Sequence, residues 1–145
     1  MEIYTIGFTR KSAAQFFGTL RTAAIEQLLD VRLNNVSQLA GFTKRNDLAF
    51  FLGELCHINY QHEAMLAPTQ AMLDDYKKRR QPWSEYAERF LRLLAERRIE
   101  KQLDPALFHR RTVLLCSEPT AERCHRRLVA EYLNKTWGDV TTVHL

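Results

Sequence analysis

The sequence predicts a single three-layer α/β domain, with a mostly parallel sheet of about five strands and helices on both faces. Three observations lead to this fold class. Short β-favouring runs alternate with helical stretches, an order that is typical of parallel sheets with crossover helices. The strongest run, residues 112–116, is apolar throughout, as expected of a central strand covered on both faces. The length of 145 residues fits one domain over residues 1–145.

The first part of the chain predicts a βαβ unit. A strand is expected at Ile3–Ile6, directly before Gly7. Ser12 and Gln15 then have the spacing of a capping box, and the apolar residues that follow recur at helical intervals. A second strand is expected at residues 28–32. Strands at this spacing are parallel and are joined by a right-handed crossover.

The middle of the chain is expected to hold a loop, a third strand and three helices. Residues 33–42 resemble a long loop, and such loops in compact domains are often functional. Asn46 is expected to cap a short helix, and a strand is expected at residues 58–62. The pattern over residues 69–103 indicates two helices, broken near Pro82, which can begin the second one.

The last third predicts a strand, a helix and a strand. The strand at 112–116 is followed by a helix from about Thr120 to Lys135, with Gly138 as a stop signal. Arg123 is expected to face water on this helix. The final strand is expected at residues 141–145, and the chain shows no internal repeat and no low-complexity segment.

Composition and charge are those of a basic globular protein. Hydrophobic residues make up 46% and charged residues 26%, which argues against disorder. No apolar run approaches the ~20 residues of a membrane span, and no signal-peptide pattern is present, so we expect a cytoplasmic protein. Three cysteines are too few for a disulfide framework, which favours reduced thiols. The charge of +4 and pI near 9.1 favour an anionic small molecule or nucleic acid as partner. The sequence does not indicate an oligomeric state.

Polar side chains gather where the predicted strands end. In open parallel sheets, ligands bind outside the carboxyl ends of the strands. The residues that the sequence places at this edge are Gly7, Thr9, Arg10, Asp30, Arg32, His62, Glu63, Cys116, Ser117, Glu118, Cys124, His125 and Arg126. Connecting turns rarely need thiols, imidazoles, carboxylates and guanidinium groups together, so this edge is predicted to be the functional one.

The chemistry expected at this edge depends on Cys116, Cys124 and His125. A thiol near a helix N-terminus and beside cationic groups has a lowered pKa, because those charges stabilise the thiolate. Cys116, at a strand end, fits that description best. His125 is expected to point inward and to act as its base or as a general acid, with Cys124 beside it.

Charged residues at the same edge are expected to bind the substrate. Arg10, Arg32 and Arg126 could hold an anionic group such as phosphate in forked hydrogen bonds. Asp30 or Glu118 would orient these partners.

No metal and no cofactor is predicted. Cys116, Cys124 and His125 are suitable ligand types, but nothing matches the close CxxC spacing of structural zinc sites. Gly7 stands alone before its helix, so the sequence holds no Gly-rich phosphate loop either.

Structural interpretations of the same residues stay open. Cysteine is among the most buried residue types and often only fills a core, and an inward histidine is often a hydrogen-bonded structural group. Arg126 could simply pair with Glu118 or Asp30. The basic run at residues 77–80, beside Trp83, could bind nucleic acid, but a solvated helix end explains it better, because cations suit the helix dipole there.

Four motifs together resemble the bacterial family catalogued as domain of unknown function 488. They are Tyr4-Thr5-Ile6-Gly7, Asp30-Val31-Arg32, Leu115-Cys116-Ser117-Glu118 and Cys124-His125-Arg126. The resemblance implies a compact α/β domain with these motifs as its functional signature, and it supplies no reaction. The chain departs from the family pattern around Phe8 and Thr9, and it lacks a Gly-rich stretch after Glu63. A weaker likeness to rhodanese-type domains makes sulfur transfer a minor alternative.

These observations lead to three hypotheses. The leading one is an enzyme that uses Cys116 and His125 on a phosphate-bearing or other anionic substrate, including nucleotide-derived ones. The alternative is a nucleic-acid-binding or regulatory module that uses the same basic edge without catalysis. A third is a protein-interaction domain whose motif only stabilises the fold. The sequence leaves open whether the protein is an enzyme at all.

Overall fold

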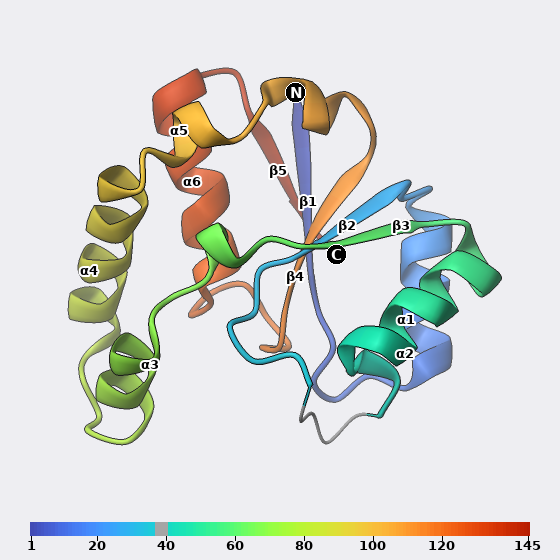
Figure 1. Ribbon diagram of the computed structural model, residues 1–145, viewed down its shortest axis with the longest axis horizontal. Helices are drawn as coiled ribbons and strands as arrows, with labels where there is room; N and C mark the ends of the chain where they lie inside the picture. The colour runs from blue at the N-terminus through green and yellow to red at the C-terminus, as the bar shows by residue number, and fades with distance from the viewer. Residues whose placement is uncertain (37–40) are drawn as a thin grey trace.

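The computed structural model describes residues 1–36 and 41–145, so part of the predicted loop at residues 33–42 lies outside the described residues. Within the described residues, five parallel strands form one sheet in the order β3-β2-β4-β1-β5 (Figure 1). The strands are β1 (Glu2–Gly7), β2 (Gln27–Asp30), β3 (Asn59–His62), β4 (Thr112–Cys116) and β5 (Thr141–His144). The predicted sheet is therefore confirmed, and β4 is its central strand.

Helices cover both faces of the sheet, as predicted (Figure 1). The helices are α1 (Ala13–Thr22), α2 (Arg45–Phe51), α3 (Gln70–Lys77), α4 (Trp83–Glu96), α5 (Ile99–Gln102) and α6 (His125–Trp137). Helices α1 and α2 lie on one face, and α3 to α6 lie on the other. A π-helical turn at Leu52–Cys56 continues α2, and 3₁₀ turns lie at Gly41–Thr43, Ala64–Leu66 and Pro105–His109. Among the described residues, no helix combines the length and the apolar character that a membrane span requires.

Side chains of β4 alternate between two apolar clusters. Val113 and Leu115 pack with residues of α1 and α2, whereas Leu114 and Cys116 pack with residues of α3 to α6. This follows from strand geometry, because successive side chains point to opposite faces of a sheet. Cys116 therefore lies at the carboxyl end of the central strand and on the face that α6 covers.

Strands β1 and β2 are parallel, as the predicted βαβ unit requires, but they are not neighbours. Strand β4 lies between them, with Gly7 opposite Cys116 on one side and Asp30 opposite Leu115 on the other. All five residues of β4 are buried. This is why the most apolar run in the chain occupies the middle of the sheet, where helices cover both faces. The carboxyl ends of all three strands consequently meet at one place.

The helix predicted from about Thr120 begins only at His125, so that prediction is wrong at its start. Residues 117–123 instead form turns across the ends of β4 and β1. The backbone N–H of Thr9 donates to the Ser117 carbonyl at 3.1 Å, and Arg126 Nη1 donates to the Glu118 carbonyl at 2.7 Å. The Ser117 and Glu118 carbonyls therefore accept hydrogen bonds from these groups and not from the N–H groups of a helix. Cys124 is thus the N-cap residue of α6 rather than a residue on its flank.

Two other predicted helix boundaries differ from the structure. The N-cap of α2 is Lys44 and not Asn46, because the Lys44 carbonyl already accepts the first helical hydrogen bond, from Leu48. The helical region at 69–103 holds three helices rather than two, because Arg98 adopts a left-handed backbone conformation (φ 52°) between α4 and α5. Pro82 stands directly before α4, close to the predicted break.

Candidate active site

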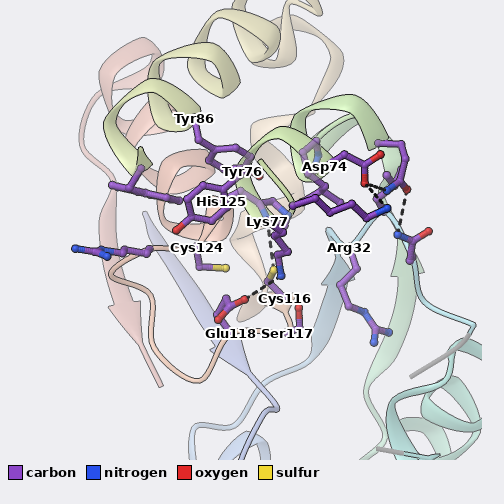
Figure 2. A pocket seen from close by; sticks show the side chains of 18 residues that line it. Arg32, Asp74, Tyr76, Lys77, Tyr86, Cys116, Ser117, Glu118, Cys124 and His125 are labelled. Carbon is purple, nitrogen blue, oxygen red and sulfur yellow. Dashed lines mark hydrogen bonds and ion pairs between the residues drawn. The ribbon is translucent and has the colours of Figure 1, made fainter. Parts of the chain in front are cut away.

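A pocket of about 330 Å³ opens beside the carboxyl end of β4. Its walls come from the ends of β2 and β4, from α3 and the start of α4, and from the first residues of α6 (Figure 2). Cys116, Cys124 and His125 line it together. The pocket therefore lies at the edge of the sheet where the sequence predicts the functional residues.

Cys116 and His125 form a buried hydrogen-bonded pair on the pocket wall. Cys116 Sγ lies 3.4 Å from His125 Nδ1, and His125 Nε2 lies 2.7 Å from the Val31 carbonyl oxygen. A carbonyl can only accept, so Nε2 carries a proton and donates it. Nδ1 then accepts from the Cys116 thiol, or, when it is also protonated, donates to the thiolate. The Phe90 ring packs edge-on against the imidazole, with 5.4 Å between ring centroids.

The two thiols beside this histidine have opposite pKa shifts. The hydrogen bond from the Cys124 thiol is the largest influence on Cys116 and lowers its pKa. The charge of Arg126 and backbone hydrogen bonds from Ser117 and Glu118 also lower it, and together these effects outweigh burial. Burial, and then the hydrogen bond to Cys116, raise the pKa of Cys124 well above its ordinary value. The direction at Cys116 agrees with the sequence-based expectation, although a neighbouring thiol is its main cause.

The same three side chains form a compact donor set. The two Sγ atoms and a ring nitrogen of His125 all lie within 4.8 Å of one another. In the described part of the chain, this is the one group of three or more His, Cys, Asp or Glu side chains found to converge in this way. Thiolate and imidazole are suitable metal ligands, and the fold brings them together without a CxxC spacing. The expectation that no metal is bound stays a prediction.

Asp30 and Arg32 form a buried ion pair below the pocket. Arg32 Nε and Nη2 each donate to one oxygen of Asp30 at 2.8 Å, and Nη2 also donates to the Thr43 carbonyl at 2.8 Å. Tyr60 donates its hydroxyl to Asp30 at 2.5 Å. Burial alone raises the pKa of Asp30, but the hydrogen bonds and charge of Arg32, with the Tyr60 hydrogen bond, reverse that effect and lower it. The guanidinium is thus committed mainly to Asp30, although its buried Nη1 has no hydrogen-bond partner among residues 1–36 and 41–145.

Arg126 supports the turn at residues 117–123 from beneath. Its side chain is only 1% exposed, and Nη1 donates to the Glu118 carbonyl. Gly7 lies against the same carbonyl: a Cβ at this position would fall 1.6 Å from the Glu118 oxygen and 3.0 Å from Arg126 Nη1. Because Gly7 has no Cβ, the Glu118 carbonyl can lie directly against β1. This close contact holds the turn and the Arg126 guanidinium near Cys116.

The predicted site residues divide into those that line the pocket and those that do not. The lining includes Cys116, Cys124, His125, Arg32 and Glu118. The carboxylate of Glu118 pairs with Lys77 Nζ at 3.3 Å. Asp30, Arg126 and Arg10 are not part of the lining: the first two are buried beneath it, and Arg10 is exposed in the turn after β1.

Several lining residues were not expected from the sequence. Lys77, Lys78 and Arg123 add positive charge to the lining. Lys77 and Lys78 stand at the exposed end of α3, as interpreted from the sequence, and Arg123 is exposed as expected, but their place at the pocket was not foreseen. Four cationic side chains and two carboxylates line the pocket, so its lining is net positive. Trp83 and Tyr86 form an aromatic wall, with 5.4 Å between their ring centroids. In the sequence, the one indication that these aromatic residues belong to a binding site was their position just after the basic run at residues 77–80.

Comparison with known proteins identifies one family. Residues 12–133 match the family model described as Domain of unknown function DUF488. No curated protein and no solved structure matches the chain. Three of the four motifs that suggested this resemblance lie within the matched residues, and each of these three contributes to the pocket lining, through Arg32, Cys116 and His125.

Proposed function

This chain belongs to the DUF488 family, and we propose that it is an enzyme that uses Cys116 and His125 on a phosphate-bearing or other anionic substrate. The substrate occupies the pocket at the carboxyl ends of the strands. The observation that carries the proposal is the hydrogen-bonded Cys116–His125 pair on the wall of a pocket with a net positive lining.

In this proposal His125 is the base and Cys116 is the nucleophile. Nδ1 takes the thiol proton, while Nε2 keeps its hydrogen bond to the Val31 carbonyl, which fixes the orientation of the ring. The Cys124 thiol and the charge of Arg126 stabilise the thiolate that results. Cys124 belongs to the catalytic group in the proposal, because its sulfur lies within 4.8 Å of the reacting sulfur.

Cationic side chains on the pocket wall bind the anionic group. Arg123 lines the pocket and forms no ion pair within the described residues, so its guanidinium can pair with phosphate. Lys77 and Lys78 share their charge with Glu118 and Asp74. A nucleotide-derived substrate would also stack its base on the aromatic wall, because stacking suits any planar ring.

The proposal is tested by screening phosphate-bearing small molecules for binding by calorimetry, followed by assays of turnover of those that bind. Cys116→Ser and His125→Ala are expected to abolish turnover, and Cys116→Ser to retain binding. Arg123→Ala is expected to weaken binding by about tenfold, which corresponds to roughly 1.4 kcal/mol for one charge-assisted contact. Cys56→Ser and Arg92→Ala are matched controls, since neither residue lines the pocket. Turnover that is unchanged by both Cys116→Ser and His125→Ala would exclude the proposal.

A nucleic-acid-binding module is the second candidate. The observation that favours it is the basic run at residues 77–80, which extends from the pocket lining to exposed Arg79 and Arg80, close to Trp83. Binding of oligonucleotides that weakens steeply with salt and is unaffected by Cys116→Ser would support this candidate. No measurable binding at low salt would exclude it.

We also propose that the protein works in the cytoplasm. Cys56, Cys116 and Cys124 are all free thiols. Free thiols suit a reducing compartment such as the cytoplasm, where glutathione and thioredoxin keep cysteines reduced.

A further inference from the structure

We propose that Cys116 and Cys124 close to a reversible disulfide, which makes the pocket wall a dithiol–disulfide redox centre. The disulfide itself does not depend on the proposed function. Only its consequence does: oxidation would remove the thiolate that the proposed reaction needs.

The geometry brings the two sulfurs close without bonding them. Both Sγ atoms belong to the donor set whose members lie within 4.8 Å of one another, and both residues are buried. A disulfide needs about 2.0 Å between the sulfurs, so the closure is a short movement.

The mobile partner in this closure is Cys124. Cys116 is fixed in the central strand, between β1 and β2. Cys124 follows the irregular turns at residues 117–123, and its side chain makes no capping hydrogen bond to α6. A rotation of the Cys124 side chain, with a small shift of these turns, brings its sulfur to Cys116 without breaking a strand pair.

The two thiols have different parts in the reaction. Cys116 has the lowered pKa and is the attacking thiolate, whereas Cys124 stays protonated until the second step. Cys116 gives its proton to His125 Nδ1, and its thiolate attacks one sulfur of a low-molecular-weight disulfide, which forms a mixed disulfide and expels one small thiolate. That thiolate takes the proton from Nδ1, so Nδ1 is free to accept again. Cys124 then gives its proton to His125 Nδ1 and attacks the Cys116 sulfur, which expels the second small thiolate; His125 passes the proton to it. Two protein thiols are oxidised, and one small disulfide is reduced to two thiols.

Cys56 serves as an internal control. It packs against the cluster of α1 and α2, on the opposite face of the sheet from Cys116 and Cys124. It has no second cysteine on its own face, so it can form a mixed disulfide with a small thiol but no intramolecular bond.

The experiment equilibrates the chelator-treated full chain with mixtures of reduced and oxidised glutathione. Free thiols are then blocked by alkylation, and the cysteines are mapped by mass spectrometry. We expect loss of alkylation at Cys116 and Cys124 together, with a peptide that joins the two residues. In Cys124→Ser, Cys116 should instead accumulate as the mixed disulfide with glutathione, because the second thiol is missing. In Cys56→Ser the joined peptide should be unchanged.

The wild-type map decides the outcome even if Cys124→Ser does not fold. A stable glutathione adduct on Cys116 beside an alkylated Cys124 would overturn the inference. So would a stoichiometric metal ion that chelation fails to remove and that protects both thiols. A joined peptide in a protein whose turnover is unaffected by Cys116→Ser would support the redox centre while excluding the proposed function.

Discussion

The reactivity of Cys116 depends on groups from several parts of the chain that meet at one sulfur. The Cys124 thiol and the His125 ring approach it from the start of α6, and the His125 ring is oriented by the Val31 carbonyl that follows β2. Arg126 adds positive charge from beneath the turn. Each of these groups has a separate effect, so each can be removed singly and its contribution measured.

The pH dependence of alkylation measures the first of these effects. Cys116 is expected to react with an apparent pKa lower than that of an ordinary thiol, and Cys124 with a higher one. Cys124→Ala should raise the apparent pKa of Cys116, because the thiol that donates to the thiolate is lost. Rates are followed by mass spectrometry, with Cys56 as the reference. If Cys116 is alkylated only after unfolding, its thiol has only a packing role in the core.

Asp30 gives a prediction about stability. In Asp30→Asn the guanidinium of Arg32, only 3% exposed, loses its counter-charge. Unfolding in urea at pH 7 should show a loss of about 3–5 kcal/mol, as for other broken buried pairs. The folded-state pKa of Asp30 is lowered, so its contribution is present above its unfolded pKa of ~3.9 and is lost as pH falls through the folded value.

The difference between wild type and Asp30→Asn should consequently shrink below about pH 4. Glu85→Gln, at the exposed start of α4, is the control and should change stability by less than about 0.5 kcal/mol. A difference that is constant from pH 7 to pH 3 would contradict the assigned charge of Asp30.

Among the elements, the turn at residues 117–123 is the one that depends most on distant partners. Its carbonyls are held by Thr9, which follows β1, and by Arg126. Gly7 allows this contact because it has no Cβ. The position of the turn, and with it the position of Cys124, is therefore decided by the end of β1.

Gly7→Ala tests this dependence. The new Cβ would meet the backbone of Glu118, which cannot rotate away, so we expect a loss of about 1–3 kcal/mol and a change in the alkylation of Cys116. Gly18→Ala is the matched control: it lies inside α1 with nothing within 4 Å of the new Cβ, and it should stabilise by about 0.5–1 kcal/mol. Equal effects of the two substitutions in urea unfolding would contradict the close approach at Gly7.

The strands were predictable because their signal is local. The apolar residues at 112–116 indicate a strand, and their unbroken apolar character indicates a central position; the structure has both features. The start of α6 was not predictable, because residues 120–123 have a helical pattern, whereas hydrogen bonds from Thr9, Arg126 and Arg127 to the Ser117, Glu118 and Glu122 carbonyls accompany the turns that replace it. The insertion of β4 between β1 and β2 is also decided by long-range packing.

The centre of the candidate site, which is Cys116, Cys124 and His125, was predictable from the sequence, whereas most of the surrounding pocket lining was not. The thiols and His125 were identified because Cys116 ends an apolar strand and Cys124 and His125 follow it within nine residues, which is a local pattern. Lys77 lines the pocket because the fold brings the end of α3 beside Glu118, and Arg123 lines it because the chain stays in turns before α6. Neighbouring residues in the sequence carry no signal for either placement. Arg10 was placed at the site by its position after a strand, whereas the left-handed turn there (φ 63°) leaves it exposed outside the pocket lining.

At the scale of the whole molecule, one sheet joins two apolar clusters. Leu114 belongs to the cluster beneath α3 to α6, and Leu115 belongs to the cluster beneath α1 and α2. Both tryptophans, Trp83 and Trp137, pack against the first cluster. Fluorescence of these residues therefore reports one face, whereas circular dichroism reports all helices and strands.

This arrangement predicts a single cooperative transition. Leu114→Ala and Leu115→Ala are each expected to cost about 2–5 kcal/mol, because both side chains are fully buried. The fluorescence and dichroism curves should coincide in wild type and in both variants, since each cluster depends on the same central strand. Curves that separate in Leu115→Ala alone would show that the two faces unfold independently.

The central place of β4 also has a consequence for the order in which the protein is synthesised. Among the described residues, strand β1 pairs only with β4 and β5, so it has no partner in the sheet until residues 112–116 have left the ribosome. Throughout that interval Ile3, which ends up fully buried in the cluster beneath α3 to α6, belongs to a nascent chain that lacks most of its later neighbours. The first strand to be translated is thus among the last to be sheltered, and during that time it is a natural target for a chaperone that binds extended apolar segments.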